Sequence, residues 1–563
     1  MRKLKKILII VLLIIVGLPI ALTIILFAIG VYLYCTADFM QPNVDVDLKQ
    51  YELTINTDSL RVCKDASLLL NQYGLWEAKV AGSPIERGAK YGVLSKDLLK
   101  FQEDVFVTQI HEIIPLESWV EFLHKLIIIF NRNMAKHIPG EYREEIYAMS
   151  LSCTNEYNSY GTPYGRQLNY HAAHDIGHTM QEYMLVGCSS FAVWDEESET
   201  KDLLIGRNFD FYVGDDFARN KVVLFVESTN GYRFASISWP GMMGVLSGMN
   251  EKGLTVTINA SKGAIPTSSA MPISLLARHI LQYASTIEDA YTIARQFETF
   301  VSESLLIGSS IDGYAAIIEK TPEKLALYKS STSRVICTNH YQSELFDSDK
   351  YNRENIATSD SPHRHKRLNE LLTQYSPINP NDAVDILRNR YGIGNTDIGL
   401  SNEKSINQFI AHHSVVFQPN ELRFWVSTAP WQLGEYVCYD LDEVFSVDSV
   451  SAKTYAIDEL NIVDDSSTLA DEYIRVCRYR EQYKDFTSVI DNKKQVEPSY
   501  INEFIDNNPN FYQVYNILGD YMLVQNNLKQ AVAYWQKALS LEIPRVGDKE
   551  DIIEKIEKIE KYD

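Results

Sequence analysis

The feature that most constrains the fold is a change of hydrophobic pattern at Gly187. Before this residue, from about Ser67, apolar residues recur mostly at helical spacing, as in residues 117–130. After it, short apolar or alternating stretches follow one another between Gly, Asn and Pro, which is typical of strands joined by turns. Two helix-spaced groups, 274–297 and 364–375, interrupt these strands. Many antiparallel strands with grouped helices predict an α+β layered fold.

The chain divides by pattern into five segments. Its 563 residues are too many for one compact core. We expect an apolar N-terminal anchor, a polar tether, a mostly helical segment, a strand-rich core and an acidic helical tail. These segments are residues 1–34, 35–66, 67–187, 188–460 and 464–563.

The tail contains a stretch, residues 511–544, that fits one tetratricopeptide unit. The residues at or beside the spacing of that repeat are Tyr515, Leu518, Gly519, Met522, Ala531, Trp535, Ala538 and Pro544. Such units generally need about three copies to bury their faces, and the tail has one clear copy. Two interpretations therefore stay open: a helical cap packed on the core, and a surface that binds a protein partner.

An uncharged apolar run extends from Ile7 to Tyr34, after the basic residues MRKLKK. A helix needs about 20 apolar residues to cross a bilayer. A cleaved signal peptide has a shorter apolar region, of about 7–15 residues. The basic cluster would keep the N-terminus in the cytoplasm. The run predicts an uncleaved, single-pass membrane anchor, with the rest of the chain on the extracytoplasmic side.

Charge and cysteine content exclude several classes of protein. The formal net charge of −21 argues against a nucleic-acid-binding surface, which would need clustered Lys and Arg. The seven cysteines include no CxxC pair, so a zinc ribbon or a thioredoxin site is not expected. Their odd number leaves at least one thiol free. We find no phosphate-binding glycine loop and expect no cofactor.

Cys188 is the candidate nucleophile, because it stands at the start of the first strand after the change of pattern. A thiol attacks only as the thiolate, and a free cysteine has a pKa near 8.5. If the bond before Cys188 is cut, the new α-amino group, with a pKa of about 7.7–8.0, can take the proton of the thiol. This scheme needs an unhindered preceding residue, which Gly187 provides. It also needs a cation near the thiol and an anion near the amine. Arg207 and Asp210 provide these if their strand pairs with the one that begins at Cys188, as the intervening turn WDEESETKD indicates.

Four motifs carry a family resemblance: GCSSFAVW, LLIGRNFDF, SWPGMMGVLSGMNEKGLTVTINASKG and ICTNHY. With these motifs in order, the chain closely resembles the 6-aminopenicillanate acyltransferase family, which is related to choloylglycine hydrolases among the N-terminal-nucleophile hydrolases. The resemblance covers roughly residues 70–440. It implies an αββα sandwich, two antiparallel sheets between helical layers. The long region before Cys188 and the helical tail depart from the family pattern.

The resemblance also implies roles for single residues. Cys188 is the nucleophile, freed by self-cleavage after Gly187, with Arg207 beside the thiol and Asp210 holding the new amine. Asn259 and Asn339 are the implied hydrogen-bond donors to the oxyanion. The implied activity is hydrolysis or transfer of the acyl group of a small-molecule, non-peptide amide through an acyl-enzyme on the cysteine.

Arg364 and Arg367 could not be matched to the family, and their spacing predicts a solvated helix face.

Two other functions stay open. The chain could be a membrane-tethered scaffold that keeps a degenerate hydrolase fold and recruits a partner through its tail. It could instead be a metal-dependent hydrolase, because His174 and His178 would share one helical face, with His171 as a third imidazole. The glutamate of the HExxH zinc motif is absent from this cluster.

Overall fold

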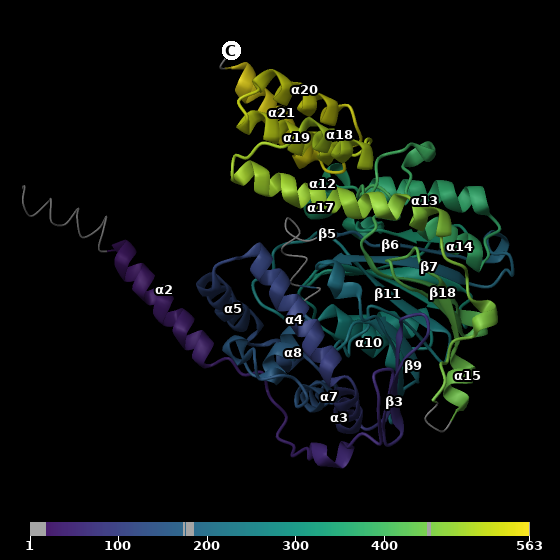
Figure 1. The fold of residues 1–563 in the computed structure, drawn as a ribbon. Helices are drawn as coiled ribbons and strands as arrows, with labels where there is room; N and C mark the ends of the chain where they lie inside the picture. Colours follow the sequence, from purple (N-terminus) through teal and green to yellow (C-terminus); the bar gives the residue numbers. More distant parts are fainter. Residues whose placement is uncertain (1–17, 173–174, 176–184, 448–451, 562–563) are drawn as a thin grey trace, which may run out of the picture.

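The computed structural model describes residues 18–172, 175, 185–447 and 452–561. Two β-sheets lie in the middle of the molecule with helices outside them (Figure 1). The larger sheet has eleven strands in the order β1-β2-β3-β4-β8-β9-β10-β11-β12-β13-β14. The smaller sheet has the order β15-β6-β7-β16-β17-β18, with β5 paired to β7.

The strands of the larger sheet are β1 (Ile55–Asn56), β2 (Leu60–Cys63), β3 (Ala66–Leu70), β4 (Trp76–Gly82), β8 (Val222–Ser228), β9 (Phe234–Ser238), β10 (Ser247–Asn250), β11 (Leu254–Ala260), β12 (Glu303–Ser309), β13 (Tyr314–Lys320) and β14 (Leu325–Tyr328). Those of the smaller sheet are β5 (Leu185–Val186), β6 (Ser189–Val193), β7 (Leu204–Tyr212), β15 (Arg334–Cys337), β16 (Ala411–Gln418), β17 (Arg423–Ser427) and β18 (Tyr436–Asp440).

The helices before the smaller sheet are α2 (Leu18–Cys35), α3 (Pro84–Leu94), α4 (Lys96–Ile113), α5 (Glu117–Asn131), α6 (Met134–His137), α7 (Gly140–Ser150) and α8 (Pro163–His171). Those within the strand-rich core are α10 (Ile273–Tyr283), α11 (Ile287–Gln296), α12 (Lys350–Thr358), α13 (Ser361–Tyr375), α14 (Pro380–Leu387) and α15 (Leu441–Ser446). The tail consists of α16 (Ser466–Ala470), α17 (Glu472–Asp491), α18 (Pro498–Asn507), α19 (Tyr512–Val524), α20 (Leu528–Leu539) and α21 (Val546–Glu560).

Strand β8 shows how the layers form. Successive side chains of a strand point to opposite faces. Val222 and Leu224 pack with the helices that cover the larger sheet, whereas Val223 and Phe225 pack against the smaller sheet. A third cluster, which includes Leu368 of α13, covers the outer face of the smaller sheet. Both faces of each sheet are therefore buried, and the predicted α+β fold of two sheets between helical layers is confirmed.

The segment before Cys188 forms part of the larger sheet. Strand β4 pairs with β8 in parallel over its whole length, from Trp76 opposite Val222 to Gly82 opposite Ser228. Residues 55–66, expected to belong to a polar tether, form β1, β2 and the start of β3. The reason is local: alternating apolar residues in this stretch, such as Val62, are buried against the core once the strand is paired.

The predicted membrane anchor is wrong. Its described part is α2 (Leu18–Cys35). Within residues 18–172, 175, 185–447 and 452–561, no helix combines the length and apolar character of a membrane span. The single-pass, extracytoplasmic location that was predicted from this run is therefore overturned. Residues 7–17 of the predicted span lie outside the described part of the chain.

The tail forms a helical layer that packs on the core (Figure 1). Helices α19 and α20 approach closely because Gly519 has no side chain: a Cβ there would lie 2.3 Å from Nε1 of the buried Trp535. Asn508 exchanges two 2.8 Å hydrogen bonds with the backbone of Leu400 in the core. The tail is thus packed on the core, while its identity as a tetratricopeptide unit stays a prediction.

Candidate active site

The site is built around the β6–β7 hairpin. The predicted pairing of these strands is confirmed, with Ser189 opposite Asn208 and Ser190 opposite Arg207. Gly206 fits under the ring of Phe191, where a Cβ would come within 2.5 Å of the ring. Cys188 precedes Ser189, so this register sets it beside the end of β7 that carries Arg207 and Asp210.

Arg207 lies next to the thiol and is fully buried. Its Nη2 is 3.8 Å from the Cys188 Sγ and also donates to the carbonyl oxygen of Ile258. Its Nη1 donates to the Leu246 carbonyl oxygen at 3.0 Å and contacts His413 Nε2 at 3.4 Å. These contacts fix the guanidinium so that one amino group faces the sulfur.

Cys188 is also fully buried. Burial raises the pKa of the Cys188 thiol, and the nearby Arg207 guanidinium opposes that rise only in part. In the uncut chain the sulfur therefore holds its proton at neutral pH. A base must take this proton before the thiol can attack.

Asp210 is a buried carboxyl group whose two oxygens have no hydrogen-bond partner among the described residues. Burial raises its pKa to about 8, despite the charges of Arg364 and Arg207. Its backbone carbonyl accepts a 3.1 Å hydrogen bond from the Gly187 amide, so it flanks the Gly187–Cys188 bond. A buried carboxyl that lacks a partner is costly, and it fits a site where a cation arrives later.

The two asparagines are close to the hairpin but are bound to backbone. Asn259, on β11, accepts a 3.0 Å hydrogen bond from Ser190 and donates to the Cys337 carbonyl oxygen at 2.9 Å. Asn339, after β15, donates to the Ala260 carbonyl oxygen at 2.8 Å. The structure thus brings both residues to the site, with their amide groups already occupied.

Arg364 was missed by the sequence analysis. Arg364 and Arg367, expected on a solvated face, are only 1% and 2% exposed. Arg364 Nη1 donates to the Cys188 carbonyl oxygen at 2.6 Å, and its Nη2 donates to Asn339 Oδ1 at 2.6 Å. It joins the nucleophile to Asn339. No signal in the helix pattern distinguishes it from a surface residue, because its partners are distant in sequence.

The proposed metal cluster is not supported at His171. Its Nδ1 lies 2.7 Å from the Gln167 carbonyl oxygen, and its Nε2 accepts a 2.9 Å hydrogen bond from the Met243 amide. Both ring nitrogens are therefore used by the backbone. His174 and His178 lie outside the described residues, and we find no metal-binding group of side chains within the described part of the chain.

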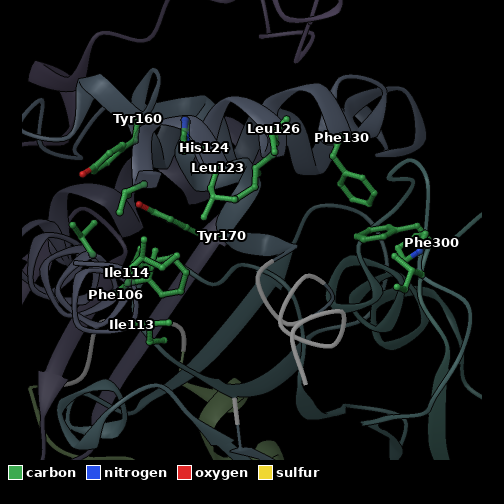
Figure 2. Close-up of a pocket in the computed structure, with 16 residues that line it drawn as sticks. Phe106, Ile113, Ile114, Leu123, His124, Leu126, Phe130, Tyr160, Tyr170 and Phe300 are labelled. Atoms are coloured by element: carbon green, nitrogen blue, oxygen red, sulfur yellow. The ribbon is translucent and has the colours of Figure 1, made fainter. Parts of the chain in front are cut away.

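An apolar pocket of about 400 Å³ lies between α4, α5 and the segment that follows β11 (Figure 2). Its walls are almost entirely carbon, from residues such as Phe106, Leu123 and Phe130 of the helices, with Ile265 and Phe300 opposite. A smaller cavity shares Phe106 with it and is lined by Phe217 and Trp239.

A row of stacked rings connects this region to the active site. Trp239 stacks on Phe211 at 5.8 Å, and Phe211 stacks on Phe209 at 5.6 Å between ring centroids. The Arg207 guanidinium lies 4.5 Å from the centre of the Phe209 ring. Packed aromatic side chains therefore extend from the smaller cavity to Arg207.

All seven cysteines are free thiols in the structure.

Comparison with known proteins gives matches that each cover about half of this chain. An uncharacterised protein of Archaeoglobus fulgidus is 22% identical over 352 residues, 56% of this chain and 58% of that protein. Protein dcd1B of Dictyostelium discoideum is 24% identical over 271 residues, 45% of this chain and 51% of that protein. The chain thus spans little more than half the length of these relatives. The solved N-acylethanolamine-hydrolyzing acid amidase ortholog of Caenorhabditis elegans matches with 13% identity and a TM-score of 0.31, over 41% of this chain and 93% of that one.

The family model of acyl-coenzyme A:6-aminopenicillanic acid acyl-transferase matches residues 194–429, which lie within the strand-rich core. The resemblance predicted from the four motifs is therefore confirmed: over residues 194–429 this chain matches the acyl-coenzyme A:6-aminopenicillanic acid acyl-transferase family.

Proposed function

We propose that this chain is an amide hydrolase of the N-terminal-nucleophile type, which cuts its own Gly187–Cys188 bond and then uses Cys188 as nucleophile. The observation that carries the proposal is Asp210, a buried carboxyl group without a hydrogen-bond partner among the described residues, beside the bond that would be cut. Cleavage would create an ammonium group at Cys188. That group is the cation which this carboxylate lacks.

Self-cleavage is an intramolecular acyl transfer. The Cys188 sulfur attacks the Gly187 carbonyl carbon, the carbon–nitrogen bond breaks, and the proton of the thiol passes to the departing nitrogen. Water then hydrolyses the thioester, which releases the Gly187 carboxylic acid and restores the thiol. The chain that begins at Cys188 now carries its own base, an α-amino group with a pKa of about 7.7–8.0.

Substrate cleavage repeats this chemistry. The amino group takes the thiol proton, the thiolate attacks the amide carbonyl carbon, and the amine leaves with the proton. Arg207, with its Nη2 3.8 Å from Sγ, stabilises the thiolate. Water then hydrolyses the acyl-enzyme. The same intermediate would acylate an amine that reached it first, as the name of the matching family describes.

The apolar pocket supports a substrate with an apolar acyl group. Its volume of about 400 Å³ and its carbon-lined walls fit a hydrocarbon chain better than a polar one. His124, which lines it, has a pKa lowered to about 4 by burial and by the Arg166 charge, so it is neutral there. The solved C. elegans protein is named for hydrolysis of N-acylethanolamines, a class of amide with which this proposal agrees.

Intact mass of purified protein tests the proposal. We expect two fragments that meet at Gly187/Cys188 in the wild type and one uncut chain in Cys188→Ala. Cys438→Ala, which removes another buried thiol, is the matched control and should be cut as the wild type is. A wild type that stays uncut and yet hydrolyses amides would refute the amine as base.

A further inference from the structure

The side chain of Gln408 lies against the bond that the proposed mechanism cuts. Its Nε2 donates a hydrogen bond of 3.4 Å to the carbonyl oxygen of Gly187, and the residue is 2% exposed. A Cβ at position 187 would come within 2.7 Å of the same nitrogen. Gly187 therefore does more than relieve crowding around the thiol, because it leaves room for this amide.

This contact has a clear electrostatic consequence. When the Cys188 sulfur attacks, the Gly187 carbonyl oxygen becomes an oxyanion. A fixed amide donor in a buried site stabilises that charge more than it stabilises the neutral carbonyl, and so it accelerates the step. The amide groups of Asn259 and Asn339 already donate to backbone carbonyl oxygens in the uncut chain. Among the described residues, Gln408 donates a side-chain hydrogen bond to the reacting oxygen.

The backbone beside Gln408 is held in an unusual conformation. Phe409 has φ of +57°, in the left-handed region that bulky residues rarely adopt. Such a conformation persists only where its surroundings enforce it. Phe409 is fully buried in a small cluster with Trp431 of the core and Val476 of α17. The segment that carries Gln408 is thus shaped by contacts from the tail.

Arg480 of α17 makes the most direct of these contacts. Its Nη2 donates a 2.7 Å hydrogen bond to the carbonyl oxygen of Phe409. Its guanidinium lies 4.6 Å from the centre of the Trp431 ring, a distance at which a cation is attracted to an aromatic face. One residue of the tail therefore binds both Phe409 and the ring against which it packs.

The tail fixes the start of the same segment as well. Asn508 bonds to both backbone groups of Leu400, and Asn402 donates to the Glu542 carbonyl oxygen at 3.0 Å. Residues 400–409 are therefore held at both ends by the C-terminal helices. Their position is set by the tail as much as by the sheet.

We propose that Gln408 is the hydrogen-bond donor to the Gly187 carbonyl oxygen during self-cleavage, and that the C-terminal helices position it through Arg480. This inference rests on the proposed self-cleavage at Gly187–Cys188. It gives the tail a role in maturation: a chain whose tail is not docked holds the nucleophile but lacks the donor that speeds its release.

Two variants at position 408 test the donor. Gln408→Met keeps the length of the side chain without a donor, and Gln408→Glu keeps its shape with a donor only when protonated. We expect the rate at which the uncut chain disappears, followed by intact mass, to fall at least tenfold in Gln408→Met at pH 8, because loss of an oxyanion donor costs a factor of about 10²–10³ in other enzymes. Relative to Gln408→Met, Gln408→Glu should cut faster at pH 5 than at pH 8. A role in packing alone would give no such pH dependence, and equal rates of the two variants at both pH values would overturn the donor role.

The tail is tested by Arg480→Met beside Arg478→Met, which alters an exposed arginine on the same helix. Arg480→Met should slow cleavage at least threefold, and Arg478→Met should leave it unchanged. Thermal unfolding midpoints within a few degrees of the wild type establish that each variant is folded. If the wild type itself stays uncut, the proposed function fails. If the wild type is cut and the Gln408→Met chain is cut at the same rate, only the present inference fails.

Discussion

The carboxyl group of Asp210 gives the sharpest test of the mechanism, because its environment must change when the chain is cut. We consider Asp210→Asn in a chain that Cys188→Ala keeps uncut. In the uncut chain the pKa of Asp210 rises from 3.8 to about 8, chiefly because the group is buried. Asparagine has nearly the same shape and does not titrate, so the pair of chains isolates this one group.

The direction in which pH changes the free energy of unfolding follows from proton binding. Between pH 3.8 and about 8 the folded chain keeps the proton on Asp210 while the unfolded chain loses it. The contribution of this group to stability is therefore complete below pH 3.8 and is lost as the pH rises toward 8. Integrated from pH 5 to pH 8, the proton linkage lowers the free energy of unfolding by about 4 kcal/mol. The Asp210→Asn chain should lack this loss.

Urea denaturation of both uncut chains at pH 5 and pH 8, followed by tryptophan fluorescence, measures the difference. Groups common to the two chains cancel when the pH dependence of one is subtracted from that of the other. The cut wild type should also lack the loss, because its new ammonium group pairs with the carboxylate. If the free energy of unfolding has the same pH dependence in the uncut chains with and without the Asp210→Asn substitution, Asp210 is not a neutral, unpartnered acid before cleavage.

Three further outcomes are expected. Arg364→Lys should lower amide hydrolysis by about 10²-fold, since a lysine lacks the planar fork through which Arg364 donates to the Cys188 carbonyl and to Asn339 from two separate nitrogens. Arg367→Lys on the same helix, whose arginine contacts Asn389 and Asn395, should keep steady-state hydrolysis within about threefold, and equal losses in the two variants would contradict a role of Arg364 at the site. Within a series of amides with longer and longer acyl chains, each added methylene should raise kcat/KM up to about fourfold until the pocket is full, because burial of one CH₂ contributes about 0.8 kcal/mol. Leu123→Asn should flatten this rise, whereas Phe122→Asn, which alters an exposed residue that does not line the pocket, should leave the rise intact. The two fragments of the cut chain should elute together in gel filtration under native conditions, and their separation would contradict the shared sheet.

Local pattern predicted the part of the site that a single hairpin contains. Cys188, Arg207 and Asp210 lie within 23 residues of one another, and the turn between β6 and β7 set their register. Because side chains alternate along a strand, the pairing of two adjacent strands was enough to bring the arginine to the thiol. The motifs added Asn259 and Asn339, which no spacing rule would have found.

The remaining residues escaped prediction for a physical reason. Helix α13 has arginines three apart, a pattern that normally faces water, and nothing local reveals that a carbonyl group from residue 188 and an asparagine from residue 339 will surround Arg364. No pattern in the sequence marks Gln408 either. Its role depends on the position of a loop that the tail, more than sixty residues further on, holds in place.

The segment before Cys188 would stay bound to the core after a cut at Gly187. Seven consecutive residues of β4 pair with β8, so loss of the segment would expose a row of unpaired backbone groups in the centre of the larger sheet. Glu145 of α7, fully buried, lies between Arg87 of the same segment and Arg278 of the core, 2.8 Å from each. Separation of the fragments would leave a buried arginine without its carboxylate, at a cost of about 3–5 kcal/mol for that contact alone. A cut after Gly187 would therefore free one amine and leave these contacts intact, so that α4 and α5 would still line the apolar pocket.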